Sequence, residues 1–540
     1  MRRLLGCFYR FKSSQLSTIN CLDSLNPRGT RGARIAINYQ LFKADSIVLS
    51  VLLIVPLLGA VLAASLPPKQ TREFALWIAV AVIGWTVLLL TKFDLSNPSM
   101  QFVENINWID ALGLSYRLGV DGLSLPLVAL NSLLTWVAIY SSDEKIDRSR
   151  LYYSLILLLN AAVTGVFLAQ DFLLFFISYE LELIPLYLLI AIWGGQKRAY
   201  AATKFLIYTA LSGALILAAF LGLAWFGGSS SFTYDPALAH ALPLSQQFLL
   251  LGALLLGFGI KMPLFPFHTW LPDAHVEAST PISVLLAGVL LKLATYGILR
   301  FCVGLFPEAW QIAAPWISVW AIVSVLYGAL MAIAQTDMKK MVAYSSVSHM
   351  GYILLAAAAN TALSFSAAMI QMVSHGLISA TLFLLVGVVY KKTKTRDIKI
   401  LEGLLNPQRG MPIIGSLMVL GVMASAGIPG MVGFVAEFLI FRSSFPVFPV
   451  QTLLCMLGTG LTSVYYLLLI NRAFFGRLSA PVQNLESVTW RERYPAMILT
   501  VAIVLFGVQP GWITRWSEPT ILATLQPPAI VATVNTSIEP

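Results

Sequence analysis

Apolar stretches of about twenty residues follow one another along nearly the whole chain, separated by short polar stretches. A helix needs about 20 such residues to cross the hydrocarbon core of a bilayer. Because the core offers no water to open backbone groups, helices are the natural way to cross it. A membrane β-barrel would show roughly ten-residue alternating segments instead, and the sequence has none. With only 11% charged residues, the chain is predicted to be an all-α, polytopic membrane protein.

The sequence predicts about fourteen transmembrane helices, which form one membrane domain over residues 45–515. The predicted spans are Ser46–Leu66, Glu73–Thr91, Val120–Tyr140, Leu151–Ala169, Phe172–Trp193, Thr203–Phe226, Gln246–Trp270, Ile282–Val303, Gln311–Ala334, Met341–Asn360, Leu363–Tyr390, Met411–Phe445, Thr452–Phe475 and Pro495–Ile513. Residues 1–44 and 516–540 are left as an N-terminal extension and a C-terminal tail.

Basic residues gather in alternate loops, a bias that marks the cytoplasmic or equivalent side of a membrane protein. The loop Lys391–Arg409 holds six of them, whereas the loops 227–245 and 304–315 hold none. With an even number of spans, both termini are predicted to face the other side. These loops also account for the net charge of +10, so nucleic acid is not expected as a partner.

The first 44 residues contradict this orientation, because they carry eight basic residues and one acid, Asp23. They lack a clean apolar signal core. One interpretation is a targeting or regulatory extension. We favour the other, in which the segment is a disordered tail or its start site is placed too far upstream.

Two of the predicted spans are interrupted. In the seventh, two prolines follow Lys261, and in the twelfth a Gly-Ile-Pro-Gly run precedes Glu437. Proline removes a backbone donor and clashes with the preceding turn. Broken helices in corresponding places of two halves point to ion sites near the bilayer midplane. The breaks lie five spans apart, which predicts two inverted five-helix repeats over about 151–303 and 311–475.

Ionisable side chains lie near the middle of consecutive spans. A charge at the bilayer centre costs at least about 2.5–3.5 kcal/mol even on the mild scales, so each needs a partner, a water path or a function. One polar residue per consecutive span is typical of a lateral relay rather than of a single binding pocket. The candidate proton-path residues are Glu180, Lys204, Lys261, Lys292, His349, His375 and Glu437.

Lysine and carboxylate side chains can act as a coupled pair. Removal from water lowers the pKa of a lysine, and a nearby carboxylate raises it again; each unit is about 1.4 kcal/mol. Moving or protonating the carboxylate therefore switches the lysine between holding and releasing a proton. Histidines titrate near neutrality and hand protons on, so the series Glu–Lys–Lys/His–Glu predicts a proton path.

Each candidate also has a purely structural explanation. Glu180 can be part of a structural ion pair, Lys204 can be an orientation signal beside other basic residues, and the mid-span histidines can bond between helices. Glu182, two positions after Glu180, is expected to point to the other face, toward a neighbouring subunit. His268 and His275, after the first break, can take up protons or cap a helix.

The chain itself is expected to hold no metal and no cofactor. Its cysteines, Cys7, Cys21, Cys302 and Cys455, are scattered without a CxxC pair, which argues against iron–sulfur ligation and structural zinc. We find no GxGxxG after a strand and no P-loop.

Three motifs carry a resemblance to a known family. They are ELELIPLYLLIAIWGG from Glu180, KMPLFPFHTWLPDAH from Lys261 and MVAYSSVSHMG from Met341. Together they resemble the antiporter-like membrane subunits of respiratory complex I, of the chain 4 type, over nearly the whole membrane domain. The segment Lys391–Glu437 and the run Glu277–Pro281 are most similar to the chain 4 group of cyanobacterial and chloroplast NDH complexes. Within that group the chain looks closer to the carbon-dioxide-uptake variant than to the respiratory one.

The resemblance implies a fourteen-helix fold with two inverted repeats and broken helices seven and twelve. It also implies roles for residues of the first half. Glu180 matches the glutamate at the subunit boundary, Lys204 the lysine that pairs with it, and Lys261 the central pumping lysine.

The resemblance implies roles in the second half as well. Lys292 matches the connecting lysine of helix eight, and Glu437 the glutamate that chain 4 uses on helix twelve. His349 and His375 match the histidines between them.

The function implied is that of a proton-translocating subunit of an NAD(P)H- or ferredoxin-dependent plastoquinone oxidoreductase in the cyanobacterial thylakoid membrane. Partner subunits, a chain 5-like subunit among them, would hold the iron–sulfur clusters and reduce plastoquinone. In the carbon-dioxide variant a partner hydrates carbon dioxide, and this sequence shows no zinc constellation for that chemistry. Two alternatives remain: a subunit of a multi-subunit sodium/proton antiporter, and a passive scaffold whose charges only hold helices together.

Overall fold

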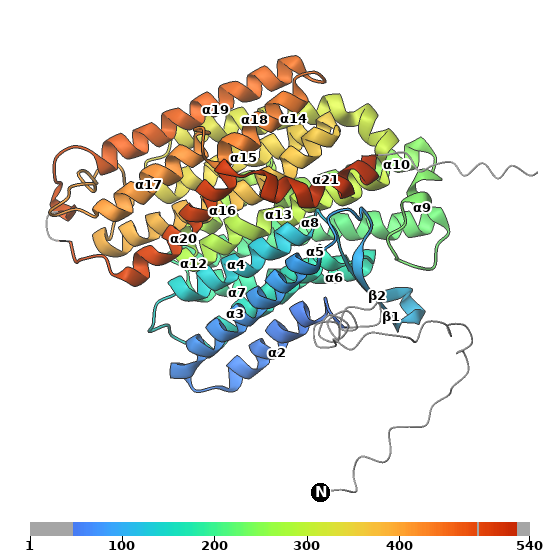
Figure 1. The fold of residues 1–540 in the computed structure, drawn as a ribbon, viewed down its shortest axis with the longest axis horizontal. Helices are drawn as coiled ribbons and strands as arrows, with labels where there is room; N and C mark the ends of the chain where they lie inside the picture. The colour runs from blue at the N-terminus through green and yellow to red at the C-terminus, as the bar shows by residue number, and fades with distance from the viewer. Residues whose placement is uncertain (1–46, 483–484, 526–540) are drawn as a thin grey trace, which may run out of the picture. The chain divides into compact units, whose positions relative to one another are not determined.

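The computed structural model describes residues 47–482 and 485–525 of the chain, and these are mostly helical (Figure 1). The basic extension predicted at residues 1–44 lies outside the described residues. The predicted C-terminal tail lies partly within them, because residues up to Leu525 form a helix.

The helices up to the first break and just beyond it are α2 (Val51–Ser65), α3 (Pro68–Lys92), α4 (Leu125–Ser141), α5 (Ser149–Leu168), α6 (Phe172–Leu181), α7 (Leu183–Trp193), α8 (Arg198–Gly227), α9 (Pro236–His240), α10 (Leu244–Lys261) and α11 (Trp270–Glu277). The later helices are α12 (Thr280–Leu285), α13 (Leu291–Gly297), α14 (Pro307–Ile333), α15 (Met338–Ala359), α16 (Ala362–Thr393), α17 (Pro412–Ser425), α18 (Val432–Ser444), α19 (Pro449–Leu469), α20 (Trp490–Val508) and α21 (Gly511–Leu525). Shorter 3-10 or π turns are η1 (Asp110–Leu112), η2 (Phe267–Thr269), η3 (Leu286–Leu290), η4 (Ile298–Val303), η5 (Ile470–Phe474) and η6 (Ala480–Val482).

The all-α membrane fold is confirmed. Within the described ranges, 10 helical segments are long and apolar enough to cross a membrane, or 11 if α20 and α21, bent by 66°, form one span. Together with three shorter apolar helices, α2, α4 and α17, these segments correspond one to one to the fourteen predicted spans. That all fourteen cross the bilayer stays a prediction.

Three segments form the interior of the bundle, and they carry Lys292, His349 and His375. The most apolar windows of Thr280–Val303 and α16 are 100% buried by other parts of the chain, and that of α15 is 94% buried, against 28% for α3. Figure 1 shows α13, α15 and α16 running among the other helices. Lys292, His349 and His375 are therefore buried within the protein.

Both predicted helix breaks are present. The first separates α10, which ends at Lys261, from α11. The second separates α17 from α18, and here Gly427 and Gly430 have φ values of +70° and +91°. Glycine adopts this left-handed region without the steric cost that a Cβ imposes, so the chain can turn sharply just before the helix that carries Glu437.

A β-hairpin that the sequence did not reveal joins α3 to α4. Strands β1 (Gln101–Ile109) and β2 (Leu114–Val120) pair antiparallel, with Asn105 opposite Arg117 (Figure 1). Glu104 of β1 is buried and accepts hydrogen bonds from the backbone of Val48 at 2.6 Å and Ser50 at 3.2 Å, just before α2. A carboxylate is favourable at a helix N-terminus, so Glu104 fastens the hairpin to the first described helix.

A buried ion pair between Asp121 and Arg300 joins the start of α4 to η4. The Asp121 carboxylate also accepts from the backbone N–H groups of Leu123 and Ser124. The neighbouring Gly122 donates to Thr520 of α21 at 3.1 Å. Helices far apart in the sequence therefore meet at this pair.

Replacing Asp121 by Asn is expected to lower the free energy of unfolding by about 3–5 kcal/mol, because it leaves Arg300 buried without a counter-charge. The D121N/R300M double variant is expected to recover much of this loss, since both charges are then gone. Thermal unfolding of the solubilised complex measures both, with the exposed Asp94→Asn as the control. A D121N melting temperature equal to that of the control would contradict the assignment.

Candidate functional site

Lys292 is the fully buried centre of the candidate site. Its Nζ lies 2.6 Å from the carbonyl oxygen of Ala287 and 2.7 Å from Nδ1 of His375. The π turns η3 and η4 flank the short helix α13 that carries it. Such turns inside helices frequently mark functional sites, and here η3 supplies the carbonyl that holds the ammonium group.

From His375 the row of ionisable groups continues into the second half. The rings of His375 on α16 and His349 on α15 have centroids 5.5 Å apart. His349 Nε2 lies 3.5 Å from the carboxylate of Glu437 on α18, which accepts from the Thr459 hydroxyl of α19 at 3.0 Å. The structure thus brings four candidates, Lys292, His375, His349 and Glu437, into one buried row.

A small cavity of about 10 Å³ lies within this row, lined by His349, His375, Gln371, Ser374 and Glu437 among others. Gln371 Oε1, Ser374 Oγ and His375 Nε2 are buried, and they have no hydrogen-bond partner in the described part of the chain. A cavity of about 10–15 Å³ with several polar partners accommodates one water molecule. The row therefore has room for a water-mediated step between the histidines and Glu437.

Lys261 forms a second buried centre, and its partner corrects the expectation for Glu182. The Lys261 ammonium makes an ion pair with Glu182, both side chains being buried, and lies 3.3 Å from the centre of the Tyr179 ring. Glu182 was expected to face a neighbouring subunit, but it faces Lys261. The two carboxylates do point in different directions, as residues two apart on a helix do, but Glu182 is the one that faces Lys261, whereas Glu180 faces Gly213 of α8.

Glu180 lies beside this pair but does not bind Lys261 directly. Its half-buried carboxylate packs against Gly213 of α8, and Oε1 has no hydrogen-bond partner among the residues described. Lys261 and Glu182 are the charged groups that act on it electrostatically. Lys261 therefore has two carboxylates near it, one bonded and one free of hydrogen bonds at Oε1.

Lys204 is paired differently from what the resemblance implied. Its Nζ lies 2.7 Å from Asp273 of α11, not against Glu180. Both side chains are partly exposed, at 20% and 35%. Lys204 lies near the start of α8, and Asp273 lies in α11, which follows the first break and packs against α8. Asp273 was not among the predicted site residues, because it lies outside the middle of a span.

The two buried centres are adjacent rather than bonded. Over residues 47–482 and 485–525, no hydrogen bond or ion pair joins Lys261 to Lys292. The helix α10, which ends at Lys261, packs against α13, which carries Lys292. The path from one lysine to the other therefore stays a prediction.

In the part of the chain that the structure describes, no three His, Cys, Asp or Glu side chains are grouped to hold a metal ion. The ionisable groups of the site are carboxylates, amines and imidazoles, all of which can exchange protons. What this arrangement can do chemically is to pass protons between buried groups.

The chain is similar to membrane subunits of quinone oxidoreductases and antiporters. Residues 169–462 match the family model described as NADH:quinone oxidoreductase/Mrp antiporter, TM. The NAD(P)H-quinone oxidoreductase chain 4 2 of Microcystis aeruginosa is 45% identical over 443 residues, which is 79% of each chain. The NAD(P)H-quinone oxidoreductase chain 4 1 of a Synechococcus species is 41% identical over 490 residues, 88% of this chain and 92% of that one.

Solved structures give the same result. A chain of respiratory complex I from Thermus thermophilus superposes with a TM-score of 0.80 and 27% identity, covering 89% of this chain and 99% of that one. A chain of the Mrp complex from a Dietzia species superposes with a TM-score of 0.77 at 21% identity, covering 89% and 97%. At that identity the Mrp likeness shows the fold alone.

Proposed function

The chain belongs to the family of membrane subunits that NADH:quinone oxidoreductases and Mrp antiporters share, and we propose that it translocates protons as the chain 4 subunit of a complex I-like NAD(P)H-quinone oxidoreductase. The observation that carries this proposal is the buried row from Lys292 to Glu437. As a subunit of that complex the chain is part of an enzyme, a translocase, although the redox chemistry takes place in other subunits.

Proton movement follows from how buried charges depend on one another. While Glu182 is charged and bonded to Lys261, the lysine holds its proton. When the carboxylate is protonated or moves away, the ammonium is left buried without a counter-charge, a state that costs several kcal/mol. Lys261 then releases its proton toward Lys292, and the row His375–His349–Glu437 carries a proton onward.

We also propose the partners and the location. Partner subunits would hold the iron–sulfur clusters and reduce plastoquinone, and a chain 5-like subunit would lie beside this chain in the membrane arm. The cyanobacterial origin of the relatives supports the thylakoid membrane as the location. We keep the carbon-dioxide-uptake complex as the proposed variant.

The alternative function is that of a subunit of a sodium/proton antiporter. The matching family model includes Mrp antiporters, but the two relatives reported above, 45% and 41% identical, are named quinone oxidoreductase subunits.

Purification of the tagged chain from native membranes separates the two functions. The expected result is co-purification with quinone-reducing subunits, together with proton uptake that follows quinone reduction and needs no sodium. Recovery with antiporter subunits alone, and sodium-dependent proton exchange without quinone reduction, would establish the alternative.

A further inference from the structure

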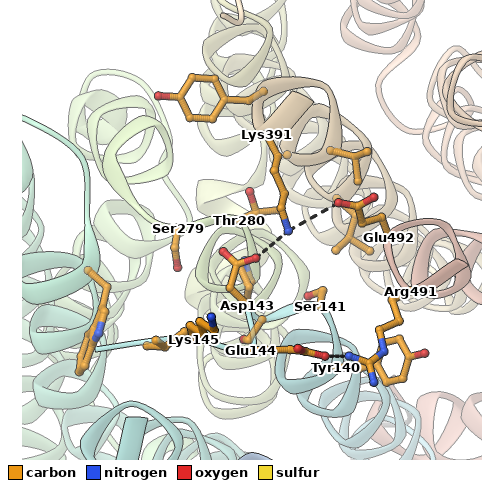
Figure 2. Close-up of a pocket in the computed structure, with 18 of the residues that line it drawn as sticks. Tyr140, Ser141, Asp143, Glu144, Lys145, Ser279, Thr280, Lys391, Arg491 and Glu492 are labelled. Atoms are coloured by element: carbon orange, nitrogen blue, oxygen red, sulfur yellow. Dashed lines mark hydrogen bonds and ion pairs between the residues drawn. The ribbon is translucent and has the colours of Figure 1, made fainter. Parts of the chain in front are cut away.

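Glu437 has partners of a different kind from the carboxylates on the side of the basic loops. There, in a cavity of about 1080 Å³, Figure 2 shows Lys391 between Asp143 and Glu492, its two ion-pair partners. Glu437 is 4% exposed, and within the described ranges its only ion-pair partner is His349, whose charge depends on protonation. The groups that hold the Glu437 carboxylate in place therefore decide how it can exchange a proton.

The two oxygens of the Glu437 carboxylate face different groups. Oε1 lies 3.5 Å from Nε2 of His349 on α15. Oε2 accepts a hydrogen bond of 3.0 Å from the hydroxyl of Thr459 on α19. The helix break also comes close on this side, because a Cβ added at Gly427 would lie 3.1 Å from Oε2. One oxygen thus faces a ring that exchanges protons, and the other is enclosed by a hydroxyl and the chain at the break.

Tyr352 on α15 fixes the direction in which the Thr459 hydroxyl donates. Its phenol oxygen lies 3.1 Å from the oxygen of that hydroxyl. A threonine hydroxyl has one proton, and the bond to the Glu437 carboxylate uses it. The phenol of Tyr352 therefore donates to Thr459, so that both hydroxyl groups donate in sequence toward Oε2.

The packing around Tyr352 holds its hydroxyl in this place. The side chain is fully buried, and its ring stands nearly at right angles to the rings of His349 and Phe441, with centroids 5.8 and 5.7 Å away. On α19, Gly458 precedes Thr459, and a Cβ added there would lie 2.9 Å from the phenol oxygen of Tyr352. The glycine therefore lets α19 approach α15 closely enough for Thr459 to reach the phenol.

The tautomer of His349 determines which of its nitrogens can exchange a proton with Glu437. Nδ1 lies 2.7 Å from the carbonyl oxygen of Ser345. Because a carbonyl oxygen can only accept, Nδ1 carries a hydrogen, and Nε2 is left to gain or lose one. In the neutral carboxyl group a proton on Oε2 would meet the donating hydroxyl of Thr459, so Oε1 is the favoured position. The hydrogen bonds thus keep the exchangeable proton on the side of His349.

We propose that Thr459, with Tyr352 behind it, is the positioning residue that orients Glu437 for proton exchange with His349, an assignment that rests on the proposed function. The proton leaves Nε2 of the imidazolium and binds Oε1 of the carboxylate: one N–H bond breaks, one O–H bond forms, and no electron moves. The cavity of about 10 Å³ that both residues line has room for one water molecule to relay it. Thr459 and Tyr352 keep their own protons throughout.

Thr459 and Tyr352 also fasten α19 to α15, and this structural role has to be distinguished from positioning. Tyr466 of α19 makes a similar contact, since its hydroxyl donates to Ser345 of α15 at 3.0 Å, but it does not bond to Glu437. The loss of a fastening contact lowers stability or assembly, whereas the loss of a positioning contact changes the pH at which the assembled complex moves protons. The pH profile of assembled complexes therefore separates the two roles.

Thr459→Val removes the hydroxyl and keeps the shape of the side chain. A carboxylate that loses a hydrogen-bond donor gives up its proton less readily. Proton uptake per quinone reduced, measured in vesicles over a range of pH, is therefore expected to rise on the acid side only at a pH about one unit higher. Thr459→Ser, which restores the hydroxyl, is expected to restore the profile. Thr462→Val is the matched control, because the Thr462 hydroxyl donates within α19, to Gly458.

Other titratable groups that face Glu437 are unchanged in these variants. They are His349 and Tyr352 of α15, His375 of α16 and Tyr465 of α19. The helices α17 and α20 also pack against α18. The first has no titratable residue, and the titratable residues of the second lie in its first turns, at 491–494. A shift that appears in T459V and not in T462V is therefore due to the lost bond to Glu437.

Tyr352→Phe tests whether the phenol acts through Thr459. Alone it is expected to shift the profile in the same direction by less than one pH unit, and in the T459V background it is expected to add no further shift. Tyr466→Phe is its control and is expected to keep the unsubstituted profile. A further shift from Y352F in the T459V background would overturn the assignment of Tyr352.

An unshifted profile in assembled T459V complexes, or an equal shift in T462V, would overturn the positioning role of Thr459. Should T459V fail to assemble, Y352F decides, and a profile equal to that of Y466F would then contradict the proposal. Lys261→Ala separates this inference from the proposed function. If K261A loses proton uptake while T459V keeps an unshifted profile, only the positioning role is wrong. If K261A keeps full uptake, the proposed function itself fails.

Discussion

Replacing Glu182 by glutamine is expected to abolish proton translocation by the assembled complex. Glu182 is the ion-pair partner of Lys261, and both side chains are buried. Removing one partner of such a pair leaves the other charge uncompensated, at a cost of about 3–5 kcal/mol. Each 1.4 kcal/mol changes a proton equilibrium tenfold, so Lys261 would no longer keep its proton. Proton uptake would therefore fall by at least about a hundredfold.

Reconstituted vesicles with a pH-sensitive dye measure this effect, normalised to the rate of quinone reduction. Glu182→Asp, which keeps the charge on a shorter side chain, is the matched control and is expected to retain part of the uptake. Comparing E182Q with the E180Q/E182Q double variant tests whether the Glu180 carboxylate partly replaces Glu182, in which case the double variant loses more uptake. Full proton uptake in E182Q would mean that the ion pair does not control Lys261.

Replacing Lys292 by methionine is expected to have an effect of the same size. Met keeps the length of the side chain but cannot exchange a proton, and Lys292 connects η3 with His375 through a 2.7 Å contact. The row from Lys292 to Glu437 is then interrupted at its first member. Proton uptake per quinone reduced is expected to fall at least about a hundredfold, within the range of positioned proton-transfer groups.

The His375→Gln variant distinguishes a break in the proton path from a general disturbance of the fold. If Lys292 and His375 act in series, K292M and H375Q each stop the same step, so the double variant loses no more than either single one. Residues in direct contact typically show such non-additivity. Additive losses of uptake in the double variant would show that the two residues act independently.

Much of the architecture could be predicted from the sequence, because the hydrocarbon core permits few solutions. Apolar stretches of about twenty residues predicted the helices, and the prolines after Lys261 and the glycines before Glu437 predicted both breaks. Mid-span charges pointed to residues that the structure buries, since a charge against lipid is costly. Lys292 and His375 are the clearest examples.

The pairing within the site could not be predicted, because it depends on which face of each helix packs against its neighbours. On a regular helix, residues two apart point in nearly opposite directions, so Glu182 was assigned away from Lys261. The structure keeps that difference in direction, but Glu182 faces Lys261 and Glu180 faces α8, and which face of a span turns inward depends on tertiary packing. Asp273 was missed for another reason: it lies near the end of a predicted span, where charged residues usually serve only topology.

The hairpin was missed because it lies between two spans and its burial depends on tertiary contacts. Glu104 looks like an ordinary loop carboxylate in the sequence, but it is buried by the backbone that precedes α2. Short strands with weak alternation give a poor signal beside strong apolar helices. Contacts between distant segments, such as Gly122 with Thr520, leave no local trace in the sequence at all.

The number of protons moved per electron by the whole complex in sealed vesicles tests the central claim, that the buried ionisable groups of this chain carry protons. With Lys261→Ala in a fully assembled complex, the account predicts quinone reduction with a lower proton-to-electron ratio than in the unsubstituted complex. An unchanged ratio would contradict it, and would leave the chain as a scaffold whose buried charges only hold its helices together.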